Sequence, residues 1–132
     1  MSQEFKVEIV NPEKSFLLKE DATEVIVPAF EGEMGILKDH ISIISFLKPG
    51  IVKVYSKSEE NKYFLEDGIV EFKDNSLSIL TSSIYNVSDL DRNKIELIVK
   101  DAEKESKSDN LDDQKRYLID QKIEVLKSLQ LN

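Results

Sequence analysis

The sequence predicts an all-β sandwich of about ten short strands over residues 1–87, followed by an antiparallel hairpin of two α-helices over residues 88–132. Two observations favour this fold class. All four glycines and three prolines lie at or before Gly68, and these residues punctuate β structure while long helices exclude them. Apolar residues recur at every second position in the first region and at helical spacing in the second.

Length and composition exclude several protein classes. The 132 residues suffice for one domain with an appendage. Eighteen Lys and Arg against 26 Asp and Glu give a net charge of −8, which argues against binding to nucleic acid or an anionic lipid surface through a basic patch. The chain has no cysteine, so it has neither a thiolate nucleophile nor a Cys-ligated metal. It shows no membrane-spanning run or targeting peptide, so we expect a small, acidic, soluble protein.

Alternation of apolar and polar residues predicts the individual strands. One face is apolar in three segments: Phe5–Ile9, Val52–Val54 and Val70–Phe72. Two denser runs, Val25–Val27 and Ile41–Ile44, predict strands that are covered on both faces. No segment of helix length separates these runs, which favours an antiparallel sandwich over βαβ units.

Turn-forming sequences separate the strands. They are Asn11-Pro12, Glu31-Gly32, Pro49-Gly50, Ser58–Asn61, Asp67-Gly68 and Asp74-Asn75. Asp67-Gly68 is typical of a two-residue β-hairpin. The segment Gly32–Gly35 predicts a tight turn at which two stretches of backbone approach closely.

The first helix is predicted to begin at Ser88. Ser88–Asp91 has the form of a capping box, with a hydroxyl at the N-cap and a carboxylate three residues later. Ile95, Ile98 and Ala102 then form a narrow apolar stripe. Because this stripe is thin, we expect the helix to depend on its packing partners.

A polar run at residues 106–110 interrupts the pattern and offers a second N-cap. Asp112 and Asp113 follow in a first turn, where the helix dipole favours anions. Two adjacent apolar stripes then mark the second helix: Leu118, Val125 and Leu129, and Ile119, Ile123 and Leu126. Two helices of roughly 16–20 residues joined by a short loop predict an antiparallel hairpin.

The only histidine, His40, limits the chemistry that the chain can perform. A Ser-His-Asp triad or a zinc site would have to use it, and the adjacent Asp39 is poor support because neighbours on a strand face opposite sides. No phosphate-binding glycine loop is present, since Glu33 between Gly32 and Gly35 would repel an anion. We therefore predict no catalytic residue, no metal site and no cofactor. A small hydrolase built on His40 is the rival interpretation.

Four basic residues of the second helix have two possible roles. They are Lys115, Arg116, Lys122 and Lys127. They could face an acidic partner, or they could form a solvated face balanced by nearby carboxylates. The sequence leaves both possibilities open.

The run Val27–His40, followed by Leu47–Gly50, resembles the signature of the epsilon subunit of bacterial F-type ATP synthases. The resemblance continues through Asp67–Phe72, Leu77–Ser82 and Ser88–Asp91 and covers essentially the whole chain. The order of parts also matches, with the sandwich first and the helical hairpin second.

The chain departs from the family pattern at three positions near this signature. Asp39 stands where the family has glycine before the histidine, and Ser42 takes the place of a proline. Asp67 replaces the first member of a glycine pair. These changes affect the loop that, by the resemblance, would face the c-ring of the synthase.

The resemblance implies a non-catalytic subunit of the central rotor stalk that couples proton flow to ATP synthesis. Its partners would be the gamma subunit, the c-ring loops and the alpha/beta catalytic head. It would lie peripherally on the cytoplasmic face of the bacterial inner membrane, with membrane contact only through the complex. The residues implied at the c-ring and stalk contact are Glu31, Gly32, Glu33, Gly35 and His40.

The resemblance also assigns regulation to the C-terminal helices, which can lie on the sandwich or extend into the catalytic head and inhibit ATP hydrolysis. Lys115, Arg116, Lys122 and Lys127 would then face that head. The alternative is a non-catalytic sandwich and helical-hairpin adaptor of another complex. Such an adaptor would not purify with ATP synthase subunits.

Nucleotide-binding members of the family place arginines along the first helix. In this chain the corresponding candidates are Asp91, Arg92 and Lys94, with Lys94 in place of the first arginine of that pattern. Lysine cannot reproduce the bidentate fork with which arginine binds phosphate. We therefore expect weak ATP binding or none.

Overall fold

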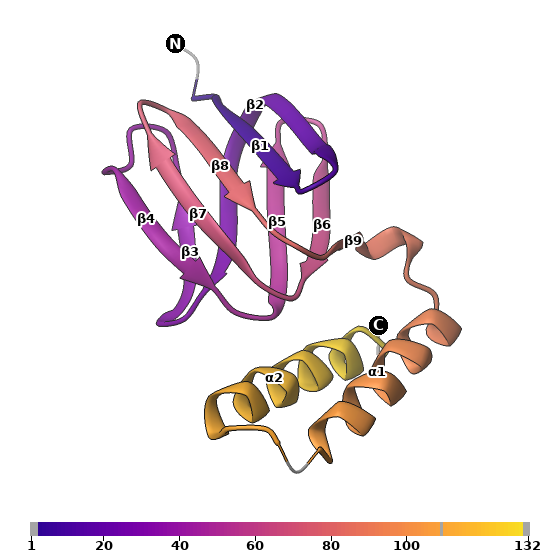
Figure 1. Cartoon of the computed structure of the whole chain (residues 1–132). Coiled ribbons are helices and arrows are strands. Elements are labelled where there is room, and N and C mark those ends of the chain that lie inside the picture. The colour runs from indigo at the N-terminus through magenta and orange to yellow at the C-terminus, as the bar shows by residue number, and fades with distance from the viewer. Residues whose placement is uncertain (1–2, 109, 131–132) are drawn as a thin grey trace.

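The structure, a computed structural model, describes residues 3–108 and 110–130 (Figure 1). These residues form nine strands, a short 3₁₀-helix (Val87–Asp89) and two α-helices. The strands are β1 (Phe5–Asn11), β2 (Lys14–Ala29), β3 (Gly32–Ile36), β4 (Ile43–Leu47), β5 (Gly50–Ser56), β6 (Glu60–Leu65), β7 (Gly68–Lys73), β8 (Ser76–Leu80) and β9 (Ile84–Asn86). The helices are α1 (Arg92–Ser106) and α2 (Asp113–Gln130).

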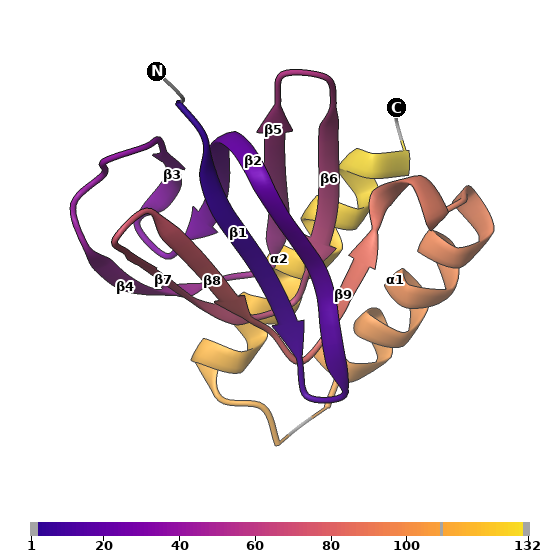
Figure 2. The ribbon, with the colours of Figure 1, turned by 90° about the horizontal axis from the view of Figure 1, so that it is seen from above.

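The strands make two layers, as the sequence predicts. One layer has the order β1-β8-β7-β4, and the other contains β3, β2, β5, β6 and β9 (Figures 1 and 2). The strands are not all short, because β2 spans 16 residues and pairs with β1, β3, β4 and β5. Its register shifts between Ala22 and Glu24, where the strand passes from one layer to the other.

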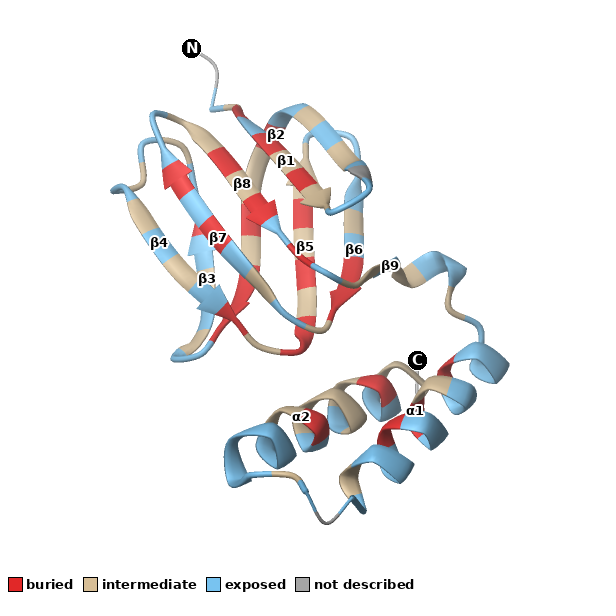
Figure 3. Ribbon diagram, in the orientation of Figure 1, coloured by how far each residue is buried: buried red, intermediate tan, exposed pale blue. Residues whose placement is uncertain are grey.

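The main core lies between the two layers, and the predicted alternation is confirmed at its strands. Phe5, Val7 and Ile9 of β1 are buried, and the ring of Phe5 packs edge-on against that of Phe72 with centroids 5.6 Å apart. The core also contains the alternating apolar residues of β5 and β7 (Figure 3). No helical residue belongs to this cluster among the described residues.

The prediction of two-sided burial at Ile41–Ile44 is wrong. Ile41 lies in the loop before β4 and is 76% exposed, and Ile44 points away from the core and is 69% exposed. In this chain the outer face of β4 is left open, since the packed layer covers only the inner face. The corresponding prediction for Val25–Val27 holds more closely, because Val25 and Val27 are buried and Ile26 is half-buried.

Two predicted turns differ in the structure. Asp67 and Gly68 do not form a β-hairpin, because β6 pairs with β5 and β9 while β7 pairs with β4 and β8. A two-residue β-hairpin turn lies at Asp74-Asn75, another of the predicted turns, where both residues have positive φ (51° and 57°), as a type I′ turn requires.

The segment Gly32–Gly35 is a strand, β3, rather than a tight turn. The turn is at Phe30-Glu31, and Gly32 beside it has φ 133°, which L side chains rarely adopt. A glycine in a tight space occurs elsewhere. A Cβ atom at Gly50 would lie 2.5 Å from the Cβ of the Pro28 side chain, so only glycine fits at this position.

The antiparallel helical hairpin is confirmed, but its first helix begins later than predicted. Asn86 caps the 3₁₀-helix at Ser88 N, and the Asp91 carboxylate caps α1 by accepting a hydrogen bond of 2.8 Å from Lys94 N. Ser88 is therefore not the N-cap of the helix. Asp112 caps α2 through Lys115 N at 2.7 Å. Within the polar run 106–110, Asp109 lies outside the described residues.

A second, smaller core joins the hairpin to the sandwich. Phe64 of β6 is fully buried with Ile95, Val99 and Leu126 of the two helices. Ile51 of β5 packs at the edge of this cluster. Burial of a side chain such as Phe64 stabilises the contact by about 1.5–3 kcal/mol.

An ion pair adds to this contact. The Lys122 ammonium of α2 pairs with the carboxylate of Glu66, which follows β6, and the two side chains are only 19% and 25% exposed. The hairpin therefore lies against one end of the sandwich, next to β5 and β6 (Figures 1 and 2).

Because none of the described helical residues belongs to the main core, a chain that ends at Val87 should fold without the hairpin. It should show a β-type circular dichroism spectrum and one cooperative thermal transition. The newly exposed Phe64 should bind a hydrophobic dye, and Phe64→Ser in the shortened chain should remove most of that binding. A shortened chain without cooperative melting would contradict this independence of the sandwich.

Candidate functional site

A row of apolar side chains crosses the outer face of the β1-β8-β7-β4 layer. Phe46 of β4 pairs with Ile69 of β7, Ile69 pairs with Leu80 of β8, and Leu80 pairs with Val10 of β1. Phe46, Ile69 and Leu80 are 64%, 40% and 57% exposed. Alternation along each strand places all four side chains on the side opposite to the core. We call Phe46, Ile69, Leu80 and Val10 the apolar row.

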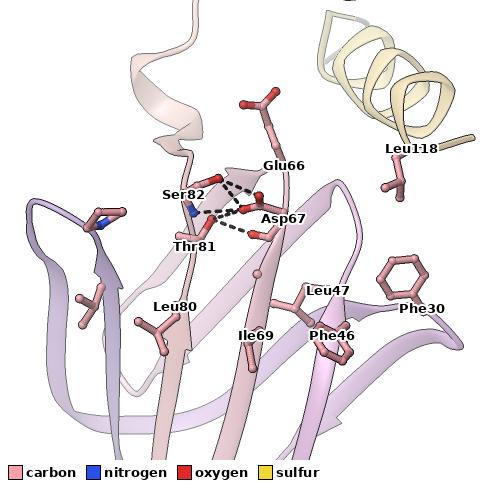
Figure 4. A pocket seen from close by; sticks show the side chains of 13 residues that line it. Phe30, Phe46, Leu47, Glu66, Asp67, Ile69, Leu80, Thr81, Ser82 and Leu118 are labelled. Carbon is pink, nitrogen blue, oxygen red and sulfur yellow. Dashed lines mark hydrogen bonds between the residues drawn. The ribbon is translucent and has the colours of Figure 1, made fainter. Parts of the chain in front are cut away.

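The apolar row forms the floor of a groove of about 480 Å³. Phe30, from the β2–β3 turn, and Leu118, from α2, also line it (Figure 4). The helical hairpin therefore supplies part of this surface in its observed position. Exposed apolar residues that gather in this way are typical of protein–protein contact sites.

Asp67 organises the polar rim of the groove. Its carboxylate accepts hydrogen bonds from Ser82 N at 3.0 Å and from Ser82 Oγ at 2.7 Å (Figure 4). The Thr81 hydroxyl donates to the Asp67 carbonyl oxygen at 2.7 Å. These bonds tie the β6–β7 connection to the segment after β8, so the rim is held in one conformation. Asp67 therefore has a structural role at this connection.

A second candidate surface is the loop between β3 and β4. His40 N donates to the Leu37 carbonyl oxygen at 3.1 Å, and the half-buried His40 ring packs edge-on against Phe72 with centroids 5.9 Å apart. Leu37 and Ile41 on either side are 56% and 76% exposed. The loop thus has a defined shape and presents apolar side chains to solvent.

The five residues that the sequence assigns to the c-ring and stalk contact lie along β3 and do not form one cluster. Glu31 is at the turn before β3, where it shares a shallow pocket with Gln114 of α2. Glu33 and Gly35 are exposed on the strand, and Gly32 is half-buried. His40 lies beyond the other end of β3. The five residues of this strand, with a length of about 17 Å, separate it from Glu31.

The four basic residues of α2 differ in their surroundings. Lys115 and Lys127 are exposed. The Arg116 guanidinium donates to the Ser106 carbonyl oxygen at 2.8 Å and so closes the end of the hairpin. Lys122 pairs with Glu66 of the sandwich, and it therefore faces the sandwich in this conformation.

The nucleotide candidates are mostly engaged in local structure. Asp91 caps α1, and Lys94 Nζ donates to the Asp89 carbonyl oxygen at 3.1 Å. Arg92 is exposed at the first position of the helix. Their geometry therefore supplies one exposed arginine rather than a converging set of phosphate donors.

The described part of the chain contains no group of three or more His, Asp or Glu side chains that could hold a metal ion. Neither helix in that part has an apolar stretch that could cross a membrane.

Sequence reasoning missed the apolar row and the exposed Leu37 and Ile41. A signal was present, because Ile44 and Phe46 on β4, and Ile69 on β7, occupy the positions that alternation assigns to the solvent face. Only the strand register aligns Phe46, Ile69, Leu80 and Val10 in one row.

Comparisons with known proteins identify the family. The model of the family described as "ATP synthase, Delta/Epsilon chain, beta-sandwich domain" matches residues 4–87. The chain is 69% identical to the "ATP synthase epsilon chain" of Pelagibacter ubique (strain HTCC1062), covering 98% of this chain and 99% of that protein. It is 32% identical to the "ATP synthase epsilon chain" of Mesorhizobium japonicum, over 98% and 96% of the two chains.

Solved structures share the fold. A chain in the Euglena gracilis mitochondrial ATP synthase (OSCP/F1/c-ring in rotational state 1) superposes with a TM-score of 0.77 at 20% identity, covering 99% of this chain and 82% of that one. A chain of the Tetrahymena thermophila mitochondrial ATP synthase central stalk and c-ring gives 0.71 at 15% identity, covering 98% of each. With the family match and the sequence identities, the chain belongs to the ATP synthase epsilon-chain family, as a non-catalytic stalk subunit of that complex.

Proposed function

We propose that the apolar row binds the gamma subunit of the central stalk, and that β3 with the β3–β4 loop meets the polar loops of the c-ring. One observation carries this proposal. The chain leaves Phe46, Ile69 and Leu80 exposed in one row, although a lone domain gains stability by covering such side chains. A partner that buries them would contribute about 25 cal/mol for each Å² of apolar area removed from water.

The charges around the row favour a partner with basic residues. Next to the apolar row, Glu71 of β7 and Glu8 of β1 both pair in register with Ser78 of β8, which lies between them. Asp67 stands at the rim of the groove. Carboxylates around an apolar floor complement an amphipathic segment with a basic flank, and they exclude acidic partners. The gamma surface that binds here would therefore combine apolar and basic residues.

We place this subunit on the cytoplasmic face of the bacterial inner membrane, attached through the complex. The high identity to a bacterial epsilon chain supports this location. In that position the subunit would transmit rotation between proton flow through the ring and the catalytic head.

We further propose that the hairpin inhibits ATP hydrolysis when it leaves the sandwich and extends toward the alpha/beta head. The Lys122–Glu66 ion pair and the burial of Phe64 hold the hairpin against the sandwich. Extension has to break that ion pair and expose Phe64. These contacts are few, so two positions of the hairpin can differ by only a few kcal/mol. In the extended position Lys115, Arg116, Lys122 and Lys127 would be available to acidic surface on the head.

Binding to gamma should depend on Phe46. Phe46→Ser should leave the melting temperature nearly unchanged, because the side chain is 64% exposed, and should weaken binding to isolated gamma by about tenfold or more. Leu97→Ser on α1 is the matched control, since Leu97 is also 64% exposed but lies outside the groove. Equal affinities for the Phe46 variant and the unmodified chain would show that gamma binds elsewhere.

The c-ring contact should depend on the charge of Glu33. Glu33→Lys should reduce ATP-driven proton pumping per ATP hydrolysed in reconstituted membranes, because it reverses an exposed charge facing the ring. Glu13→Lys, in the turn after β1, serves as the control for a charge change elsewhere on the surface. Unchanged pumping efficiency for Glu33→Lys would exclude this contact.

The hairpin proposal makes two predictions of opposite sign for the assembled enzyme. Ending the chain at Val87 should raise ATP hydrolysis and leave ATP synthesis nearly intact. Glu66→Gln should shift the hairpin toward extension by about two- to fivefold, the effect of a partly exposed ion pair, and so lower hydrolysis. Hydrolysis rates that are equal for the shortened and full-length forms, at low and high salt, would mean that the hairpin does not inhibit.

A further inference from the structure

The Asn75 side chain connects the β7–β8 hairpin turn to both the backbone and the side chain of Asp39 in the β3–β4 loop. Asp39 N donates to Asn75 Oδ1 at 2.7 Å, and Asn75 Nδ2 donates to Asp39 Oδ1 at 2.9 Å. The two residues are 36 positions apart in the sequence. This reciprocal pair, which we call the Asp39–Asn75 clasp, joins two turns at the same end of the sandwich.

Both members of the clasp have an unusual backbone conformation. Asp39 has φ 67° and Asn75 has φ 57°, in the left-handed region that non-glycine residues rarely adopt. Asp and Asn tolerate this region better than other side chains because their short polar groups can form local hydrogen bonds. At Asp39 the two hydrogen bonds come from a distant segment, Asn75, and they favour the turn that the loop adopts.

The conformation held by the clasp determines what the loop presents. Asp39 lies between Leu37 and Ile41, whose side chains are 56% and 76% exposed. His40 packs on Phe72, and its Nδ1 lies 2.8 Å from the Ile41 carbonyl oxygen, which anchors the inner side of the loop. The loop is therefore ordered although its apolar side chains contribute little to the core of this chain.

We propose that Asp39 and Asn75 are positioning residues that hold the β3–β4 loop in the shape in which Leu37 and Ile41 contact the c-ring loops. This inference rests on the proposed contact between the loop and the ring. The clasp itself does not touch the partner. It lowers the cost of binding because the loop is already ordered before the contact forms.

The test measures the binding of full-length variants to ATP synthase complexes that lack this subunit. Asn75→Gly keeps a residue suited to the type I′ turn and removes both hydrogen bonds of the clasp. Asp39→Gly keeps the positive φ and removes only the bond between the two side chains, because the backbone N–H of residue 39 can still donate to Asn75 Oδ1. Each variant should bind about three- to tenfold more weakly, the effect expected when one or two hydrogen bonds no longer order the loop.

The exchanged pair Asp39→Asn with Asn75→Asp can remake both hydrogen bonds with the roles of the side chains reversed. It should restore the affinity to within about twofold of the unmodified chain. Hydrogen exchange at the amide of residue 39 should be slow in the unmodified chain and in the exchanged pair, and fast in Asn75→Gly. A role in fold stability alone would lower the melting temperature and leave the affinity for the complex unchanged.

Ile41→Ser serves as the reference for the contact itself. If it weakens binding while both glycine variants bind normally, the clasp has no positioning role and the proposed contact stands. If all three variants bind like the unmodified chain, the loop does not meet the ring, and both proposals fail. An exchanged pair that binds as weakly as the glycine variants, although its amide exchange is slow, also overturns the positioning role.

Discussion

The 16-residue strand β2 is the constraint on which the rest of the sandwich depends. It pairs with β1, β3, β4 and β5, and thus takes part in both layers. Its irregular register between Ala22 and Glu24 lets one continuous strand turn from one layer to the other. Because the layers are joined in this way, their inner faces enclose one core, and their outer faces are left for other contacts.

The outer face of the β1-β8-β7-β4 layer leaves large apolar side chains exposed. Ile44 and Phe46 are as apolar as the residues of an inner strand, but in this chain they face solvent. The dense apolar run at Ile41–Ile44 therefore misled the prediction of burial, because periodicity does not show whether the chain itself covers an apolar face. A subunit that functions inside a larger assembly can keep such side chains because the assembly buries them.

The hairpin is attached by a much smaller contact than those that hold the sandwich. Phe64 and the Lys122–Glu66 ion pair connect it to β6, and Leu118 brings α2 to the end of the groove beside the apolar row. The position of the hairpin therefore affects a surface that we assign to gamma. Small contacts of this kind permit a change of position without unfolding of the sandwich.

The sequence by itself determined the β-sandwich, the helical hairpin and the family, because alternation, helical spacing and the Val27–His40 signature are local patterns. Only the tertiary structure decided which apolar residues are exposed together. Strand register aligns Phe46 with Ile69 and Leu80, and the loop packing brings Asp39 to Asn75. The tertiary structure also decided that Lys122 faces Glu66 and that Asp91 caps α1. These contacts join segments distant in the chain or depend on local cap geometry, which a linear pattern does not specify.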